Sequence, residues 1–536
     1  MRRMRGLMMD FPLTLTAIFR RAEMLFGARA IVTRLPDRSV HRGTYADFTG
    51  RTRRLMRALA DLGIRPGDRV ATLAWNHHQH LETYFAVPLS GAVLHTLNLR
   101  LHPDELAYIV NHAEDRALVV DQSLLPLYER IRSRVNIPTV IVIGDAPDGT
   151  VGYETLVAQT PPVAELPALA EPDAAVLCYT TGTTGRPKGV LFSQRSLTLH
   201  TIGLCLPDAL DIGERDVVLP VVPMFHANAW GFPFSCTMSG SGMVLPGACL
   251  DPASVLELMA SERVTVGAGV PTIWMAVLQA LDAAPGRYDL SALRFVVAGG
   301  AAPAPALMRA LEERHGVRVL HAWGMTETSP LGSVSHLPAA LADAPIDEQW
   351  RQRAKQGRPT PFVEIRARNA DDLVPWDGRT MGELEVRGPW VAAGYFKDDR
   401  GDRFTSDGWF KTGDIVTIDA TGTIEIQDRS KDLVKSGGEW ISSVALENAL
   451  MGHPSVAEAA VVAIAHPKWG ERPLAAIVLK PGAAASAAEL RAFLEPDFPK
   501  YCLPDAFEFI DAIPRTAAGK FLKSALRERF KDYRLE

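Results

Sequence analysis

The sequence predicts an α/β protein with a large N-terminal domain built on parallel sheets, a β-rich subdomain and a smaller C-terminal domain. Three observations support this prediction. A strand–helix–strand pattern runs from Leu293 to Trp323, short alternating strands begin at Gly382, and a charged run at Asp428–Lys431 sets off a last segment of domain size. With 536 residues, 47% of them hydrophobic, the chain can form more than one core.

The strand–helix–strand pattern gives the clearest local prediction. Residues 295–297 form an apolar strand, and Pro303 opens a helix that Gly316 ends. Residues 317–320 then form a second strand, so the pair should be parallel and joined by a right-handed crossover. Because ligands bind beyond the carboxyl ends of such strands, we expect the loops at 299–302 and 321–327 to contribute to a site.

Other segments predict further elements. Pro103-Asp104-Glu105 and the spaced apolar residues up to Ala113 predict a scaffold helix. The apolar run 174–178 predicts a buried strand, and residues 383–386 and 423–426 predict strands of the β-rich subdomain. The basic and apolar start of the chain predicts an amphipathic N-terminal helix and not a signal peptide, since Asp10 and Pro12 interrupt its apolar stretch.

Composition excludes several classes of protein. The net charge of -5 with mixed signs argues against a nucleic-acid surface, which needs clustered Lys and Arg. The five cysteines are widely spaced and lack a Cys-x-x-Cys pair, which argues against a disulfide framework or a zinc cluster and favours a reducing cytoplasm. No window approaches the roughly 18 apolar residues of a membrane span. We therefore expect no integral membrane segment, and any membrane contact would be peripheral.

The most informative segment is Tyr179-Thr180-Thr181-Gly182-Thr183-Thr184-Gly185-Arg186-Pro187-Lys188-Gly189. Glycines, threonine hydroxyls and a lysine follow a predicted strand, where backbone N–H groups can receive an anion. It is not a Walker loop, because Pro187 stands where that motif needs its second glycine. The segment predicts a phosphate-binding loop, and the alternative is a simple Gly/Thr turn with a solvated lysine.

This segment resembles the phosphate loop of the AMP-forming adenylate ligases, the superfamily of acyl-CoA synthetases, luciferases and peptide-synthetase adenylation domains. Four more motifs of that family follow in its order: Trp323-Gly324-Met325-Thr326-Glu327, Asp407-Gly408-Trp409-Phe410-Lys411-Thr412-Gly413-Asp414, Asp428-Arg429-Ser430-Lys431-Asp432 and Pro514-Arg515-Thr516-Ala517-Ala518-Gly519-Lys520. The segments Pro223–Trp230 and Lys435–Ser443 look most like bacterial medium- and long-chain fatty acyl-CoA synthetases, and enzymes acting on 3-methylthiopropionate look similar too. The likeness covers nearly the whole chain.

The resemblance implies a domain organisation and a reaction. Residues 1–427 would bind ATP and the acyl substrate, residues 428–432 would be a hinge, and residues 433–536 would form a small mobile α+β lid domain. ATP would activate a carboxylic acid, a medium- or long-chain fatty acid, to acyl-AMP, and CoA would then give acyl-CoA with release of AMP and pyrophosphate. The implied cofactors are ATP, Mg²⁺ and CoA, and the fatty acyl branch implies a homodimer.

The resemblance assigns the residues around the phosphates. Lys520 would bridge the substrate carboxylate and the α-phosphate, and Thr326 would contact the α-phosphate. Glu327, with Thr184, would hold Mg²⁺, in keeping with the preference of magnesium for oxygen ligands. The β- and γ-phosphates would be wrapped by Thr180, Thr181, Gly182, Thr183, Thr184, Gly185 and Lys188. Thr181 stands where most relatives have serine, so the hydroxyl is kept.

The resemblance also assigns the nucleoside. Asp414 and Arg429 would bind the ribose, and the alternative for either residue is a surface ion pair. The adenine slot would be formed by Gly300, Ala301, Ala302, Trp323 and Gly324, with Met325 in the same motif. Trp323 replaces the more usual tyrosine, which leaves an aromatic wall but puts any contact of a tyrosine hydroxyl in doubt.

The acyl and CoA steps involve a third group. By resemblance, His226 would lie beside the acyl carbonyl and Trp230 would cover the acyl channel, with Gly324 also near the substrate. Lys435, Gly437 and Gly438 would line the path of the CoA thiol, and Lys431 would be the pivot of the hinge. A second histidine group, His77, His78 and His80, is expected to serve packing and not a metal, because structural zinc needs four closed ligands.

Several alternatives stay open at this point. The acid could instead be 3-methylthiopropionate, an aryl acid or a short-chain acid, and the acceptor could be a carrier protein. A catalytically inactive nucleotide or acyl-adenylate sensor is a third reading, against which the intact Lys520, Glu327 and Asp414 weigh. Free CoA is favoured as the acceptor, since the sequence shows no fused carrier segment.

Overall fold

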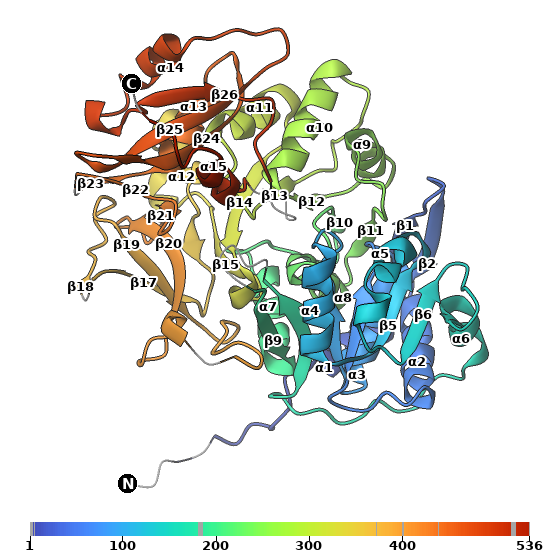
Figure 1. Cartoon of the computed structure of the whole chain (residues 1–536). Coiled ribbons are helices and arrows are strands. Elements are labelled where there is room, and N and C mark those ends of the chain that lie inside the picture. Colours follow the sequence, from blue (N-terminus) through green and yellow to red (C-terminus); the bar gives the residue numbers. More distant parts are fainter. Residues whose placement is uncertain are drawn as a thin grey trace. The chain divides into compact units, whose positions relative to one another are not determined.

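The computed structural model describes residues 4, 6–180, 186–370, 372–398, 401–437, 439–515 and 521–534. The chain divides into two compact units (Figure 1). The first contains residues 1–180, 187–249 and 395–397, and the second contains residues 181–186, 250–394 and 398–536. Both units combine helices with β-sheets, which confirms the predicted α/β class.

A seven-stranded sheet forms the centre of the first unit, in the order β7-β6-β5-β3-β4-β8-β9. Its strands are β3 (Arg69–Leu73), β4 (Val93–Thr96), β5 (Asp115–Asp121), β6 (Thr139–Ile143), β7 (Val151–Gly152), β8 (Ala174–Tyr179) and β9 (Gly189–Ser193). All neighbouring strands are parallel except β8 and β9, which form an antiparallel pair. The buried strand predicted at 174–178 is β8, and the predicted phosphate loop joins it to β9.

A second group of strands in the first unit is ordered β10-β11-β1-β2. These are β1 (Ala30–Arg34), β2 (Val40–Thr44), β10 (Val217–Pro220) and β11 (Gly242–Leu245), with only β2 antiparallel to its neighbour. The helices of this unit are α1 (Leu15–Leu25), α2 (Tyr45–Asp61), α3 (His78–Leu89), α4 (Pro103–Ala113), α5 (Leu125–Glu129), α6 (Tyr153–Gln159), α7 (Gln194–Cys205) and α8 (Phe232–Ser239). Helix α4 has the bounds predicted from its sequence.

The N-terminal helix does not lie where the sequence predicted it. Residues 6–14 are not helical, and the first helix, α1, begins at Leu15. Pro12 lacks a backbone N–H and Thr14 is extended, so the helix starts only after them. The amphipathic character is present in α1 itself, whose side chains Leu15, Ile18, Phe19 and Ala22 are buried on one face.

In the second unit, β12 (Val266–Gly269), β13 (Phe295–Ala298) and β14 (Val319–Gly324) are parallel neighbours. β15 (Leu331–Val334) and β16 (Arg358–Pro359) extend this row in antiparallel fashion. The helices here are α9 (Pro252–Ser261), α10 (Pro271–Ala283), α11 (Pro305–His315) and α12 (Ile346–Ala354). The strand–helix–strand prediction is confirmed by β13, α11 and β14, and Gly316 ends α11 in the left-handed region at φ 67°.

The β-rich subdomain is a five-stranded antiparallel sheet in the order β18-β17-β19-β20-β21. Its strands are β17 (Glu364–Asn369), β18 (Asp372–Leu373), β19 (Gly382–Arg387), β20 (Phe410–Ile418) and β21 (Ile424–Arg429). The two strands predicted here are β19 and β21. Strand β21 includes Asp428 and Arg429, so the predicted hinge begins inside regular structure.

The last part of the second unit is an α+β layer. It contains β22 (Val434–Ser436), β23 (Glu439–Ile441), β24 (Val456–His466), β25 (Gly470–Leu479), β26 (Ala506–Phe509), α13 (Ser443–Met451), α14 (Ala487–Leu494) and α15 (Lys523–Arg529). The strands are ordered β23-β22-β25-β24, with β26 also pairing with β25. Alternate residues of β24 pack against α13 and α14 on one face and against α15 on the other. No helix of the described residues is long and apolar enough to cross a membrane.

Candidate active site

The loops expected to hold the adenine leave the same edge of the second unit's parallel strands. Ala298 of β13 pairs with His321 of β14, so residues 299–302 follow the carboxyl end of β13, and residues 323–327 form the end of β14 and the turn after it. Gly300 has φ 81°, a conformation that favours glycine. Gly324 is also required for space, because a Cβ there would lie 1.9 Å from the carbonyl oxygen of Pro330. The backbone therefore comes close together where a flat base could lie against it.

Asp414 is held by two donors from different elements. The indole Nε1 of Trp323 donates to its Oδ2 at 3.1 Å, and the Nε of Arg429 lies 2.8 Å from its Oδ1. Asp414 and Arg429 face each other across β20 and β21, and Gly332 lies so close to the indole ring that a Cβ would come within 2.3 Å of it. Asp414 is only 1% exposed, so it is not part of a surface ion pair. Its two oxygens have further lone pairs, which suits a diol such as a ribose.

Glu327 is a buried carboxylate beyond β14. It lies with Thr326 in a short 3-10 turn, Thr326–Thr328, and both side chains are buried. Its backbone oxygen accepts a hydrogen bond from Ala392 N at 2.7 Å, which fixes the turn. One carboxylate beside a hydroxyl fits Mg²⁺, which usually takes one or two protein carboxylates together with phosphate oxygens and water. Across the described residues, no group of three or more His, Cys, Asp or Glu side chains could hold a metal.

The two ends of the predicted phosphate loop are joined to each other. Thr180 N donates to the carbonyl oxygen of Lys188 at 2.9 Å, and Lys188 N donates to Thr180 Oγ1 at 3.3 Å. These bonds continue the β8–β9 pairing beyond Tyr179 and Gly189. The Lys188 ammonium lies 4.8 Å from the centroid of the Tyr395 ring, within cation–π range.

His226 and Trp230 flank a left-handed turn. The residues Ala227, Asn228, Ala229, Trp230 and Gly231 all have positive φ, between 44° and 83°. Left-handed backbone costs a non-glycine residue roughly 1–2 kcal/mol, so packing must hold this turn. Asn228 is fully buried, and its Oδ1 accepts from the Tyr84 hydroxyl at 3.3 Å and from the Cys178 thiol at 3.6 Å. The turn thus has fixed contacts, and it leaves His226 and Trp230 half-buried at its ends.

Lys435 and Gly437 belong to the hairpin of β22 and β23. Lys435 is exposed, and its backbone N–H donates to Glu471 Oε2 at 2.8 Å. Gly437 has φ 60°, donates its N–H to Trp469 O at 2.8 Å, and lies so close that a Cβ would come within 2.8 Å of the Trp469 ring. The glycine is therefore required by both conformation and space.

Several predicted site residues lie outside the described residues: Thr181, Gly182, Thr183, Thr184, Gly185, Gly438 and Lys520. Their roles stay predictions. Of the others, the structure brings three groups of residues together. Trp323, Asp414 and Arg429 form the first, and Thr180 with Lys188 form the second. The third is the loop of Gly300, Ala301 and Ala302 with the turn of Met325 to Glu327. Lys431, the predicted pivot, is exposed.

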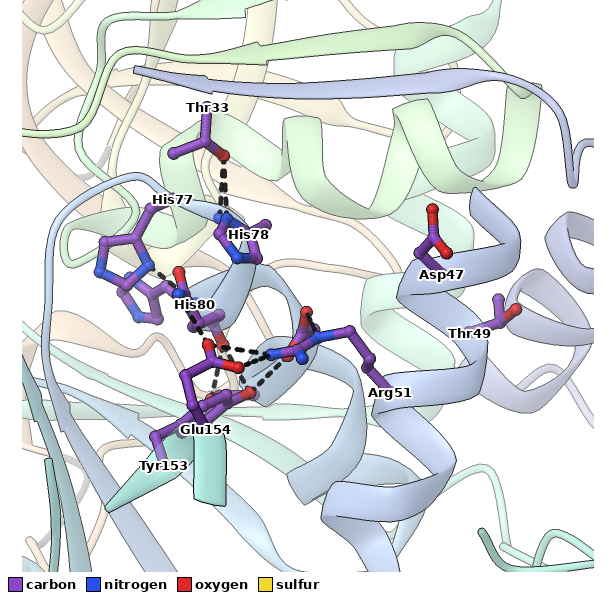
Figure 2. Close-up of polar contacts among 12 residues, drawn as sticks. Thr33, Asp47, Thr49, Arg51, His77, His78, His80, Tyr153 and Glu154 are labelled. Carbon is purple, nitrogen blue, oxygen red and sulfur yellow. Dashed lines mark hydrogen bonds and ion pairs between the residues drawn. The ribbon is translucent and has the colours of Figure 1, made fainter. Parts of the chain in front are cut away.

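The histidines 77, 78 and 80 have structural contacts (Figure 2). His77 Nδ1 accepts from the backbone N–H of His80 and caps α3. His80 is fully buried, with its ring nitrogens 3.0 Å from Trp75 O and from Thr72 Oγ1. Below them Arg51 pairs with the buried Glu82 at 2.7 Å and with the exposed Glu154 at 3.0 Å, a polar network that joins α2, α3 and α6 of the first unit.

Sequence reasoning missed the contact between Lys188 and Tyr395, which joins segments far apart in the chain. No spacing or composition signal connects them, since the contact arises from the hydrogen bond of Phe396 N to Gly189 O at 2.8 Å. It also missed the bond from Trp323 to Asp414. The one signal in the sequence was the tryptophan itself, because an indole N–H can only donate, whereas a phenol can also accept.

The comparisons with known proteins agree with this geometry. Residues 19–396 match the family described as AMP-binding enzyme, and residues 445–520 match the AMP-binding enzyme C-terminal domain. The chain is 50% identical to a long-chain-fatty-acid–CoA ligase of Thermus thermophilus, over 98% of this chain and 97% of that protein. It is 44% identical to a 3-methylmercaptopropionyl-CoA ligase of Ruegeria pomeroyi over 99% of both chains, and 42% identical to a medium-chain-fatty-acid–CoA ligase of Ectopseudomonas oleovorans.

Solved structures share the fold. The anthranilate CoA ligase AuaEII in complex with anthranoyl-AMP is 27% identical, with a TM-score of 0.86 over 97% of this chain and 98% of that one. ATP-bound MatB from Rhodopseudomonas palustris is 27% identical, with a TM-score of 0.83 over 97% and 99%.

Fold and comparisons together define the class of the protein, an enzyme that activates an acid with ATP. The chain belongs to the AMP-binding enzyme family of adenylate-forming ligases. It is an acid–CoA ligase that uses ATP, Mg²⁺ and CoA.

Proposed function

We propose that the acid is a medium- or long-chain fatty acid, converted to acyl-AMP and then to acyl-CoA. The single observation that carries this proposal is the 50% identity, over 98% of the chain, to a ligase for long-chain fatty acids. A second candidate, 3-methylthiopropionate, is favoured by the 44% identity to 3-methylmercaptopropionyl-CoA ligases over 99% of the chain.

Adenylation needs alignment and charge neutralisation more than acid–base chemistry, because a carboxylate must attack the α-phosphate of a polyanion. Asp414, fixed by Trp323 and Arg429, would accept the two ribose hydroxyls. Thr180 and Lys188 would place the loop around the β- and γ-phosphates, and Thr326 would contact the α-phosphate. Lys520 would neutralise charge where carboxylate and phosphate meet.

A bound Mg²⁺ would supply a positive charge to the phosphate oxygens. Glu327 and Thr184 are the residues proposed to hold it, and the buried carboxylate of Glu327 is the observation that supports this assignment.

The thioester step needs different neighbours, since the CoA thiol must reach the carbonyl after pyrophosphate has left. We place Lys435, Gly437 and Gly438 along that path and Lys431 at the pivot of the segment 428–432, so that residues 433–536 act as a lid and residues 1–427 as the larger domain. The close packing of Gly437 on Trp469 supports a narrow path, because a side chain at this position could not be accommodated.

The acyl chain would enter beside the left-handed turn of residues 227–231. His226 would orient the carbonyl, and Trp230 would cover an aliphatic channel. The buried contacts of Asn228 support this assignment, because they hold both side chains in place at the two ends of one rigid turn.

One experiment separates the candidate acids and acceptors. Pyrophosphate release and kcat/KM are measured for straight-chain acids from acetate to palmitate, 3-methylthiopropionate and cinnamate, with and without CoA. In an aliphatic channel, each added methylene should contribute about 0.8 kcal/mol until the channel ends. A maximum at the sulfur acid would favour the second candidate, and a maximum at cinnamate would contradict both. Pyrophosphate release with no acyl-CoA formed would favour a carrier-protein acceptor.

We also propose a cytoplasmic homodimer. The observations that support it are the free cysteines and the likeness to the fatty acyl branch. Light scattering of the purified chain at micromolar concentration tests the dimer, and a monomer mass would contradict it.

A further inference from the structure

Helix α15 follows the loop that carries Lys520 and bears two cations on one face. Lys523 and Arg527 are spaced by four residues, so both side chains point to the same side of the helix. Arg527 contacts the segment 428–432 directly, through Asp432, and Lys523 is connected to it through Ser443. This segment is the hinge of the proposed mechanism. Neither contact was expected from the sequence.

Lys523, whose side chain is 10% exposed, belongs to a chain of hydrogen bonds that leads to Asp428. Its ammonium lies 2.7 Å from Glu447 Oε1 of α13 and also donates to the hydroxyl of Ser443. Asp428, at the end of β21 and 1% exposed, accepts from the Ser443 backbone N–H at 2.7 Å and from the Ser443 hydroxyl at 2.5 Å. Glu447 accepts in addition from Val461 N of β24 at 2.7 Å. The cluster is thus connected from α15 through α13 to β21.

Arg527 makes the second contact, an ion pair with Asp432. Asp428 and Asp432 differ in one respect that matters for the hinge. Asp428 precedes the proposed pivot Lys431 and would stay with the larger domain, whereas Asp432 follows the pivot and would move with α15. Rotation about Lys431 must therefore break the contacts of Asp428 and can keep the contact of Asp432.

The loop before α15 is fixed at its base. Leu522 N donates to Pro514 O at 2.7 Å, and Arg515 and Phe521 form a β-bridge. The guanidinium of Arg515 pairs with Glu458 Oε1 at 2.5 Å and lies 4.8 Å from the centroid of the Phe521 ring. Arg515 and Phe521, which precede and follow residues 516–520, are therefore paired with each other, and Arg515 is also bound to β24 through Glu458.

We propose that Asp428, Ser443, Glu447 and Lys523 form a latch that holds α15 against β21 and α13 in the arrangement of this structure. Asp428 and Lys523 are positioning residues, since they touch neither substrate in this scheme. The latch opens when the lid rotates between the two half-reactions. The inference rests on the proposed function, and it adds a set of contacts that favours one of the two arrangements of the lid.

The experiment compares Asp428→Asn with Asp432→Asn, two carboxylate-to-amide changes that each remove a charge facing a cation of α15. Adenylation is measured as ATP–pyrophosphate exchange with dodecanoate, and thioester formation is measured from synthetic dodecanoyl-AMP and CoA. Asp428→Asn should slow one of the two half-reactions about tenfold while sparing the other, as expected for loss of one charge-assisted hydrogen bond that exists in only one arrangement. Asp432→Asn should change both rates by the same factor. Equal effects of Asp428→Asn on both half-reactions, or none, would overturn the latch.

A second measurement does not depend on activity. Hydrogen exchange at residues 441–447, where Ser443 donates to Asp428, should rise in Asp428→Asn and not in Asp432→Asn. If the wild-type chain activates no acid at all, the proposed function fails while hydrogen exchange still tests the latch. Unchanged exchange in Asp428→Asn would show that this carboxylate does not hold the start of α13.

Discussion

At residue 323 the indole N–H is bonded to the carboxylate of Asp414. A phenol in that position could both donate and accept, whereas an indole can only donate. Asp414 therefore always receives a donor from this side, and its remaining lone pairs point to other partners. The bond fixes the orientation of the carboxylate, which would lower the cost of ordering the site if Asp414 binds the nucleotide as proposed.

Trp323→Phe tests this role. Phenylalanine keeps an aromatic ring against Gly332 but removes the donor to Asp414. Loss of a hydrogen bond to a buried charged group costs about 1.5–3 kcal/mol, so KM for ATP should rise about tenfold or more with a smaller change in kcat. Steady-state kinetics at saturating acid measure the effect.

The matched control is Trp390→Phe. Trp390 is also buried in the second unit, and its Nε1 donates to Leu331 O at 3.0 Å, away from Asp414. It should lower the unfolding temperature without raising KM for ATP. A similar KM in wild type and Trp323→Phe would show that the indole does not position Asp414.

Among the elements, the left-handed turn of residues 227–231 depends on one glycine for its exit into α8. A Cβ at Gly231 would lie 2.7 Å from both His200 Cε1 and Leu204 Cδ1 of α7. Gly231 has φ 83°, where a side chain is also strained. Conformation and space therefore both require glycine at this position.

Gly231→Ala should destabilise the fold and disturb the acyl site. Gly63→Ala is its control, because Gly63 has φ 86° with nothing within 4 Å of the added carbon. Overpacking costs typically 1–3 kcal/mol, so Gly231→Ala should lose about that much more stability than Gly63→Ala. Urea unfolding measures the difference. Chain-length preference should change only in Gly231→Ala, and equal stability losses would contradict the steric argument.

The stability of the first unit should depend on pH because of His80 in α3. Burial, with His77 nearby, lowers the pKa of His80 to about 3. The unfolded chain binds a proton near the ordinary histidine pKa, so the contribution of neutral His80 to stability is present above that pH and is lost as the pH falls from about 6.5 towards 3.

His80→Gln should remove this part of the pH dependence. Between pH 7.5 and pH 5 the wild type should lose about 2 kcal/mol more than the variant, because each pKa unit is worth about 1.4 kcal/mol. Urea unfolding of both proteins at the two pH values measures the difference. His102→Gln removes an exposed histidine and should behave like the wild type. Parallel losses in wild type and His80→Gln would show that His80 titrates in the folded protein.

For the whole molecule, the proposed mechanism assigns one lysine to each half-reaction, Lys520 to adenylation and Lys435 to thioester formation. Lys520→Ala should lose ATP–pyrophosphate exchange but keep thioester formation from supplied acyl-AMP, and Lys435→Ala should do the reverse. Removal of one transition-state contact typically costs about 10²–10³ in rate, which is enough to separate the two steps. Equal damage to both steps by each variant would contradict two arrangements of the lid.

Much of this architecture follows from local sequence signals. Pro103 and the apolar spacing after it predicted α4 to the residue, and the pattern around residues 295–320 predicted the parallel pair that positions Trp323. The turn at 227–231 could not be predicted, because Ala, Asn, Ala and Trp adopt left-handed backbone only under tertiary packing. The first helix was placed too early, since charge and apolarity do not show where a helix begins.

Contacts between distant segments could not be predicted from the sequence for another reason. Lys188 reaches Tyr395, and Lys523 reaches Glu447, through packing that no periodicity encodes. Motif resemblance predicted which residues belong to one site, but not which side chains hold them. The supporting residues are therefore the part that the structure adds.

The bond between Trp323 and Asp414 also gives the enzyme an optical reporter. Indole emission responds to the hydrogen bonds and polarity around the ring, and the chain has ten tryptophans. If nucleotide binds at Asp414 as proposed, it should change the surroundings of Trp323, and the difference between the spectra of wild type and Trp323→Phe would isolate that signal. Occupancy of the site can then be followed in real time without a label and without turnover.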